Sequence, residues 1–455
     1  MSSPEEAHGP WWEDRVTWWA LLLAAWLRFL PMAMWPMQPC VRDECTYMKL
    51  AERIMDGEGL TSAAAGWLWA PGYPYLMALH EWITGFPAMV KGTQTVLFLA
   101  TMPIAYCMVR DHLSKQAARW LLFLLALSPT LVFFSVTLWS ECFYTAVLFL
   151  ALYSLGWARN GGPLRAAVPG ALVGLCVLFR GVATYMLPVF AVGYIWRRWR
   201  DQRTWAGVIA MILAAVLVVA PYAASATQRW GGLIISDRTM GQMMWLGNNT
   251  FEPVTFDWGN GTLSGAAFNQ ILEDGRDRCP KSLGPIAWDD CERQGGVDWI
   301  KANPEEFVER VPMRVAQLMN PNSFLTRHLR WNKWKELSDG PREALVILVI
   351  VWSLLATIGG TIGAWARGRG WLLIITAGVV LYHTAAISLL AGLSRYRVPL
   401  DAIWLIWTAG LLAEPRKAWE ELTAEKWRLV GCILTLLVLT PFALWYLTAG
   451  FAESQ

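Results

Sequence analysis

Two adjacent carboxylates, Asp43 and Glu44, begin a segment of the loop 37–88 that has the spacing of an amphipathic helix. One helical face would carry Asp43, Tyr47, Leu50 and Ile54, and the opposite face would carry Lys49, Glu52, Arg53 and Asp56. Such a helix beside an apolar segment is expected to lie at a membrane interface, where Asp43 would reach a water-soluble acceptor and a lipid-borne donor together. The alternative is that Asp43 only caps the helix, because Asp is a frequent N-cap residue.

Three arginines, Arg180, Arg395 and Arg397, lie in short turns between apolar segments, on the same expected side of the membrane as the Asp43 loop. Basic residues are disfavoured on that outer side, and a planar guanidinium binds phosphate through two parallel hydrogen bonds. The three arginines therefore predict a bound anion on the outer side. The alternative is that each pairs with a carboxylate or lies among lipid headgroups.

Two further ionisable residues lie within or at the ends of apolar segments, Arg28 in the first and Glu141 near the outer end of the fourth. Residues of this kind usually face the protein interior and are often functional. Arg28 and Glu141 could instead pair with one another, which would be a structural role. His383, inside another apolar run, is expected to be a core histidine with satisfied hydrogen bonds.

The elements that must position these side chains are membrane helices. Of 455 residues, 55% are hydrophobic and only 16% are charged, whereas an average globular protein carries about 25% charged residues. The 30 tryptophans agree with a membrane protein, because Trp is enriched where the bilayer meets water. The first apolar run, from Trp18 to Trp35, lacks a small-residue cleavage site and is expected to be a retained span. No nucleic-acid-binding signature occurs, so nucleic acid is not an expected partner.

About eleven apolar segments approach the roughly 20 residues that a membrane-spanning helix needs. They are 17–36, 89–109, 117–135, 138–158, 165–180, 182–197, 204–226, 343–366, 370–392, 397–413 and 428–449. Basic residues in the short loops agree on one cytoplasmic side, which places the N-terminus inside and the C-terminus outside. The expected fold class is therefore an all-α polytopic membrane protein with interfacial helices in its first outer loop.

Three parts are expected along the chain. Residues 1–226 would form an N-terminal transmembrane module that includes the catalytic first outer loop, 37–88. Residues 227–342 are polar enough for a small, mainly helical extracytoplasmic lobe. Residues 343–455 would contribute the C-terminal transmembrane helices.

The eight cysteines fall into two groups. Cys107, Cys142, Cys176 and Cys432 lie inside apolar runs and are expected to be buried thiols. Cys40, Cys45, Cys279 and Cys291 lie in the two long outer loops, and no cysteine has the spacing of a zinc site. In an oxidising compartment, proximity in sequence favours the disulfides Cys40–Cys45 and Cys279–Cys291.

Four stretches carry a resemblance to a known family. They are Asp43-Glu44-x-x-Tyr47-x-x-x-Ala51 followed by Gly57-x-Gly59, Trp69-Ala70-Pro71-Gly72-Tyr73-Pro74, Ser128-Pro129 followed by Ser140-Glu141, and Ser394-Arg395-Tyr396-Arg397-Val398-Pro399. In these stretches the chain resembles the GT-C membrane glycosyltransferases, in particular the branch of protein O-mannosyltransferases and aminoarabinose (lipid A) transferases. A weaker similarity is Gly247-Asn248-Asn249, and Ala70 departs from the pattern because many relatives have a second Pro there.

The resemblance implies a hexosyl- or pentosyltransferase that moves a sugar from a polyprenyl-phosphate donor to a lipid, glycan or protein acceptor on the extracytoplasmic face. Asp43 would be the base of a single inverting displacement, and the candidates for binding the donor phosphate are Arg180, Arg395 and Arg397. Glu44 and Glu141 would be supporting acids. No cofactor is required, and a divalent cation near these carboxylates is compatible with the chemistry without being needed.

The expected sugar or acceptor pocket consists of Tyr47, Trp69, Tyr73, Tyr396 and Asn248, although aromatic residues of an interfacial loop more often anchor a protein in the membrane. The expected location is a bacterial inner (plasma) membrane. The rival functions are a polyprenyl-lipid transporter or flippase and a non-catalytic protein that binds the carrier lipid. The sequence shows no clear internal repeat, which weakens the transporter interpretation.

Overall fold

The computed structural model of the chain describes residues 9–34, 40, 43–59, 68–250, 273–275, 277–321, 324–330, 337–391 and 394–452. Within these residues the regular structure is helical, apart from an isolated bridge between Leu68 and Arg238. The predicted all-α fold class is therefore confirmed. Parts of the loop 37–88 and of the lobe 227–342 lie outside the described residues.

Helices occupy every segment that the sequence marks as apolar. They are α1 (Arg15–Met34), α4 (Val90–His112), α5 (Lys115–Leu127), α6 (Pro129–Val136), α7 (Glu141–Arg159), α8 (Ala167–Phe179), α9 (Leu187–Ile195), α10 (Gln202–Trp230), α16 (Asp339–Leu354), α17 (Gly360–Arg367), α18 (Gly370–Leu389), α19 (Val398–Ala413) and α21 (Lys426–Ala452). A π-helical turn, Leu355–Gly359, joins α16 to α17.

Six helical stretches in the described residues are long and apolar enough to cross a membrane. They are Arg15–Met34, Pro87–His112, Glu141–Arg159, Gln202–Trp230, Asp339–Arg367 and Gly370–Leu389, and the pair α5–α6, bent by 52°, would make a seventh. The chain is thus an integral membrane protein. The larger number of about eleven spans stays a prediction, because α8 and α9 belong to apolar helices shorter than a full span.

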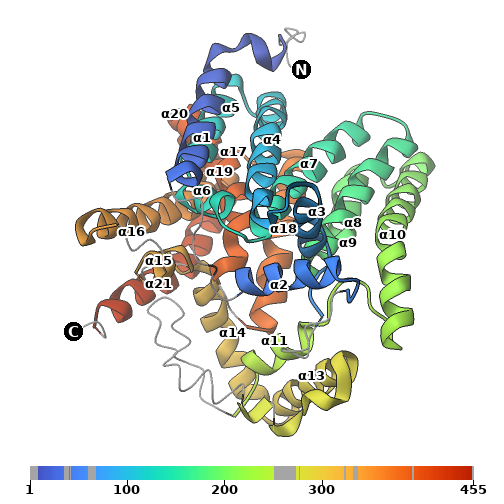
Figure 1. Ribbon diagram of the computed structural model, residues 1–455. Coiled ribbons are helices and arrows are strands. Elements are labelled where there is room, and N and C mark those ends of the chain that lie inside the picture. Colours follow the sequence, from blue (N-terminus) through green and yellow to red (C-terminus); the bar gives the residue numbers. More distant parts are fainter. Residues whose placement is uncertain are drawn as a thin grey trace.

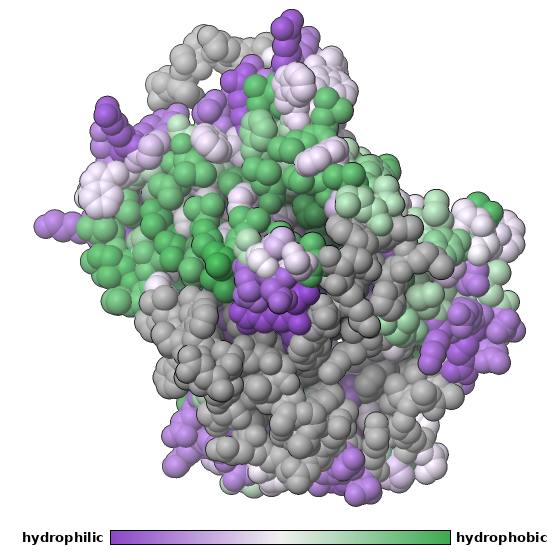
Figure 2. All heavy atoms as spheres, turned by 60° about the vertical axis from the view of Figure 1, so that its left-hand side comes forward, coloured by the Kyte–Doolittle hydropathy of each residue, from purple (hydrophilic) through white to green (hydrophobic). Residues whose placement is uncertain are grey.

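Large apolar side chains also cover part of the outer surface, as a lipid-facing protein requires. Figure 2 shows apolar residues over a wide area of the upper part of one face. Trp19 on α1 is 68% exposed and Leu217 on α10 is 72% exposed. Apolar surface of this extent is rare on a soluble monomer and is typical of a surface that contacts lipid or another protein.

The break between α5 and α6 follows from Ser128-Pro129. The Ser128 side chain accepts a hydrogen bond from the N-terminal turn of α6, and Pro129 is the first residue of that helix. Because proline has no N–H, the carbonyl of Leu125 loses its helical partner. The buried guanidinium of Arg28 on α1 donates to this carbonyl at 3.1 Å and to that of Ala126 at 3.2 Å. Arg28 therefore supplies hydrogen-bond donors to the backbone carbonyls that the bend leaves without a helical partner.

The loop after α1 contains two helices, α2 (Asp43–Met55) and α3 (Gly72–Thr84). The buried face of α2 consists of Glu44, Tyr47, Leu50 and Ala51. Asp43 is therefore at the edge of the buried face, and Glu44 takes the inner position. The helix ends just before Gly57, whose φ of 76° lies in the left-handed region that glycine tolerates. Figure 1 shows α2 across the middle of the molecule, below the ends of α1 and α4 in this view.

The polar segment between α10 and α16 contributes α11 (Met240–Gly247), α13 (Gly284–Ala302), α14 (Pro304–Met319) and α15 (Phe324–Arg330). Figure 1 shows α11 and α13 at the end of the molecule opposite the N-terminus. A further amphipathic helix, α20 (Pro415–Ala424), precedes α21. The domain boundaries at 226 and 342 and the extracytoplasmic position of this segment stay predictions.

Close helix packing depends on glycine where α8 meets α10. A Cβ added to Gly170 would lie 2.1 Å from the backbone carbonyl oxygen of Met211. The neighbouring atom belongs to backbone, so it cannot move away as a flexible side chain would. Glycine at this position therefore sets the distance between the two helices.

Gly170→Ala is expected to lower stability by about 1–3 kcal/mol, because α8 and α10 must separate to admit the methyl group. The measurement is the apparent melting temperature of the detergent-purified protein. Gly92→Ala is the matched control, since Gly92 is also helical and an added Cβ meets nothing within 4 Å there. An equal melting temperature for both variants would contradict the packing argument.

A second prediction concerns Glu292 on α13, which is 3% exposed. Burial raises the pKa of this carboxyl from 4.5 to about 7, while Arg278 opposes the shift. Between these two pH values the folded chain keeps a proton that the unfolded chain has lost, so stability falls as the pH rises from 4.5 through 7. The loss amounts to about 3 kcal/mol.

Glu292→Gln is expected to be more stable than the wild type at pH 8 and equal to it near pH 4.5. The measurement is the difference in melting temperature between the two proteins across that pH range. Glu309→Gln, a change at an exposed position of α14, is the control and is expected to follow the wild type throughout.

Candidate active site

Asp43 and Arg395 form an ion pair between residues 352 positions apart in the sequence. Arg395 Nη1 donates to Asp43 Oδ2 at 2.5 Å. Asp43 is the first residue of α2, and Arg395 lies in the short 3₁₀ helix η7 (Ser394–Arg397) between α18 and α19. The Asp43 side chain is 26% exposed, so it combines an ion pair with access to solvent.

Glu141 is the carboxylate at the centre of the site. Its side chain is only 1% exposed, and Oε1 lies 2.5 Å from Arg180 Nη1 and 3.2 Å from Arg395 Nε. Glu141 is the first residue of α7, where the helix dipole favours a negative charge. Of the two alternatives for Arg28 and Glu141, the structure does not form the pair between them, because the guanidinium of Arg28 donates to the carbonyls at the α5–α6 bend.

The four residues before and at the start of α7 each contact a different part of the site. Leu138 donates its backbone N–H to Glu44 Oε1 at 3.0 Å. The Trp139 ring centroid lies 4.9 Å from the guanidinium carbon of Arg395. Ser140 Oγ accepts from Arg180 at 3.3 Å. Residues 138–141 therefore join the loop 37–88 to both arginines.

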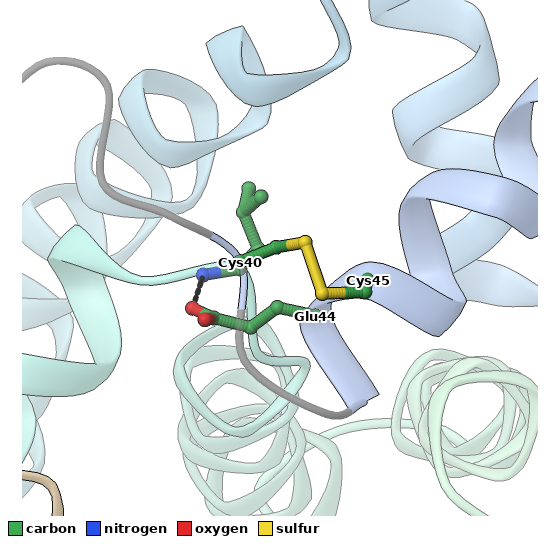
Figure 3. The surroundings of a disulfide bond; sticks show 4 residues. Cys40, Glu44 and Cys45 are labelled. Atoms are coloured by element: carbon green, nitrogen blue, oxygen red, sulfur yellow. Dashed lines mark hydrogen bonds between the residues drawn. A yellow bond between two sulfur atoms is a disulfide. The ribbon is translucent and has the colours of Figure 1, made fainter. Parts of the chain in front are cut away.

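Glu44 turns away from Asp43 into the protein and is 2% exposed. Figure 3 shows its carboxylate accepting the hydrogen bond beside a disulfide that joins Cys40 to Cys45. The disulfide closes a short loop across the start of α2 and so restrains the residue on which the ion pair depends. A second disulfide joins Cys279 to Cys291.

The aromatic residues Tyr47, Trp69 and Tyr73 of the loop 37–88 pack together. The Tyr47 ring meets those of Trp69 and Tyr73 edge-on, with centroids 5.1 Å apart in both pairs. Tyr73 is fully buried and donates to Gln94 Oε1 at 3.0 Å. Tyr47 and Tyr73 therefore lie in the protein core rather than at a membrane surface. Tyr396 is half-buried, and its ring lies 4.9 Å from the guanidinium carbon of Arg180.

Two candidate residues lie apart from this cluster. Arg397 is 1% exposed and donates to the carbonyls of Met319 and Asn320 at 2.7 and 2.8 Å, and its Nε lies 3.0 Å from Asp401. Asn248 is fully buried and accepts from Arg314 at 2.9 Å. The structure thus brings Asp43, Glu141, Arg180 and Arg395 together, but it holds Arg397 and Asn248 in separate hydrogen-bonded groups.

Sequence reasoning missed Trp139 and Arg314. Trp139 precedes the Ser140-Glu141 motif, and its position next to a buried carboxylate was the available signal. Arg314 follows Arg310 by one helical turn on α14, and both are 4% exposed. His383 is a buried core histidine as predicted, with Tyr144 Oη 2.9 Å from its Nε2 and the Val379 carbonyl 2.9 Å from its Nδ1.

In the part of the chain that the structure describes, no three His, Cys, Asp or Glu side chains are grouped to hold a metal ion. Asp43 and Glu141 both contact Arg395, whereas Glu44 is turned toward Leu138. The chemistry available to the described side chains is that of a partly exposed carboxylate beside two guanidiniums. Such a set can accept a proton at Asp43 and stabilise an anion at Arg180 and Arg395.

No protein-family model matches the chain, and no curated protein matches it in sequence. Solved structures do match. The apo crystal structure of the Archaeoglobus fulgidus oligosaccharyltransferase aligns with a TM-score of 0.52 at 13% identity, over 98% of this chain and 57% of that chain. Archaeal oligosaccharyltransferase AglB from the same organism, in complex with an inhibitory peptide and a dolichol-phosphate, aligns with a TM-score of 0.53 at 14% identity, over 96% and 56%.

ArnT from Cupriavidus metallidurans bound to undecaprenyl phosphate aligns over 89% of this chain and 78% of that chain at 12% identity, but its TM-score of 0.37 is too low to support an argument. The chain spans little more than half the length of the archaeal chains. Similarity at this identity shows the fold alone. The chain therefore shares the fold of these archaeal oligosaccharyltransferase structures.

Glu141→Gln is expected to destabilise the fold by about 3–5 kcal/mol, because it leaves two largely buried guanidiniums without their shared carboxylate. The measurement is the apparent melting temperature. Glu414→Gln is the control, because Glu414 is 34% exposed in its pair with Arg367 and should cost less than about 1 kcal/mol. Similar losses in the two variants would show that Glu141 is not the centre of the cluster.

Proposed function

We propose that the protein is an integral membrane glycosyltransferase that moves a sugar from a polyprenyl-phosphate donor to an acceptor on the extracytoplasmic face. The observation that carries the proposal is the chain of ion pairs Asp43–Arg395–Glu141–Arg180 within a GT-C fold. The archaeal structure with dolichol-phosphate supports a lipid-phosphate ligand for this fold. The acceptor would be a hydroxyl or amine of a lipid, glycan or protein.

Asp43 would take the proton from the acceptor as its oxygen or nitrogen attacks the anomeric carbon. The bond between that carbon and the phosphate oxygen breaks in the same step, and its electron pair leaves with the lipid phosphate. Arg395 and Arg180 would stabilise the growing negative charge more in the transition state than in the ground state. One displacement inverts the anomeric centre.

Asp43 and Glu141 differ in the solvent exposure of their side chains, and this difference gives them different roles. Asp43, at 26%, is the one that a substrate can reach, whereas Glu141, at 1%, is sealed behind the two arginines. Glu141 is therefore a positioning residue for Arg180 and Arg395. Arg397 would hold η7 against the end of α14, since its donors are already used by Met319, Asn320 and Asp401.

The pocket for the sugar or acceptor would lie beside Tyr396 and Tyr47, next to the exposed side of Asp43. Tyr73 and Trp69 would support Tyr47 from behind, as their edge-on packing suggests. An extracytoplasmic site is supported by the distribution of basic residues and by two disulfides, which persist in oxidising compartments. A divalent cation is not part of the proposed step.

The proposal is tested by transfer of labelled sugar from a mixture of polyprenyl-phosphate sugars by the purified full chain. Asp43→Asn is expected to reduce transfer by about 10²–10⁴-fold, because it removes the base while keeping the size and shape of the side chain. Glu52→Gln, on the exposed face of the same helix, should keep wild-type activity.

Equal transfer by wild type and Asp43→Asn would show that Asp43 is not the base and that its role at the start of α2 is structural. The absence of transfer in either protein, together with carrier binding that Arg395→Ala weakens, would favour a protein that binds or flips the carrier lipid.

A further inference from the structure

We propose that the donor phosphate takes the place of Asp43 on Arg395, so that the base is released only when the donor is bound. The inference rests on the proposed function and deepens it. It starts from an observation about the site as it stands: the residue best placed to act as a base is held by a residue best placed to bind the donor.

The ion pairs balance the formal charge of the cluster. Within the described residues, they join two carboxylates, Asp43 and Glu141, to two guanidiniums, Arg180 and Arg395. Among these four side chains, no surplus positive charge is present for an entering phosphate unless one carboxylate leaves. Carboxylate and phosphate bind the guanidinium fork with the same geometry, so they compete for the same donors.

The two carboxylates differ in their freedom to leave. Glu141 is 1% exposed, contacts both arginines and lies at the N-terminus of α7. Asp43 contacts Arg395 through one oxygen and is 26% exposed at the very start of α2. Displacing Glu141 would take the shared buried carboxylate from Arg180 and Arg395 at once, whereas Asp43 can rotate toward solvent. Asp43 is therefore the carboxylate that an entering anion displaces.

Arg395 cannot follow Asp43 outward, because aromatic rings surround its guanidinium. The guanidinium carbon lies 4.9 Å from the Trp139 ring centroid, 5.3 Å from that of Tyr396 and 5.8 Å from that of Phe324. Glu141 holds the Nε side. Exchange of anions at a fixed guanidinium is thus the available movement, rather than movement of the arginine.

The exchange couples donor binding to catalysis. While Asp43 Oδ2 lies 2.5 Å from Arg395 Nη1, that oxygen is occupied by the guanidinium and is not presented to an acceptor. Once the donor phosphate occupies Arg395, the released carboxylate can take the acceptor's proton. After transfer, Asp43 can return to Arg395 and compete with the polyprenyl phosphate product. The coupling predicts that the lipid donor binds productively before the acceptor.

The test is equilibrium binding of undecaprenyl phosphate to the purified full chain in detergent. If the Asp43–Arg395 pair is formed about 90% of the time, it weakens the apparent affinity about tenfold, and Asp43→Asn should bind roughly tenfold more tightly than wild type. Asp43→Ser, which also removes the negative charge, should show the same gain. Glu52→Gln removes a charge from the same helix without contact to Arg395 and should bind as wild type does. Undecaprenol, which lacks the phosphate, should not distinguish the variants.

Affinity that stays unchanged or falls in both Asp43 variants, while the wild type binds, would overturn the inference and leave the proposed transfer reaction intact. The absence of phosphate-dependent binding in wild type and Glu52→Gln, together with the absence of sugar transfer, would remove the proposed function itself. Elution of each variant at the wild-type position on size-exclusion chromatography establishes that the comparison is between folded proteins.

Discussion

Burial of Glu141 is the constraint on which the rest of the site depends. A carboxylate with 1% exposure requires compensating charge, and Arg180 and Arg395 supply it from the end of α8 and the turn before α19. The requirement fixes three separate parts of the chain against one another. It also leaves Arg395 with donors for a second anion, which is Asp43 in the structure described here.

Compensation of buried polar groups also explains how the helices tolerate their breaks. Pro129 interrupts the α5–α6 pair and leaves the Leu125 carbonyl without a helical donor, and Arg28 supplies one. At the far end of α6, the side-chain amide of Gln94 donates to the carbonyls of Ser135 and Thr137. Buried polar side chains thus satisfy backbone carbonyls at both places where the chain leaves helical geometry, before α6 and after it.

The position of the loop 37–88 depends on the turn 137–140 as much as on the loop's own sequence. Glu44 accepts from the Leu138 N–H, and the Cys40–Cys45 disulfide closes the chain across the start of α2. Together these two contacts hold Asp43 where Arg395 can reach it. The position of the exposed Asp43 thus depends on the turn 137–140, and that turn depends on the buried Glu141.

Sequence alone determined the helical membrane fold, because apolar length and the scarcity of charge leave few other solutions. It also placed α2 and its end near Gly57, and it singled out Asp43, Glu141, Arg180 and Arg395. Tertiary structure decided which partners these residues contact. Arg28 donates to backbone carbonyls rather than pairing with Glu141, and Arg397 contacts Asp401 and two backbone carbonyls. Ion pairs between residues as distant as 43 and 395 are decided by helix packing, and no local spacing encodes which of several arginines meets a given carboxylate.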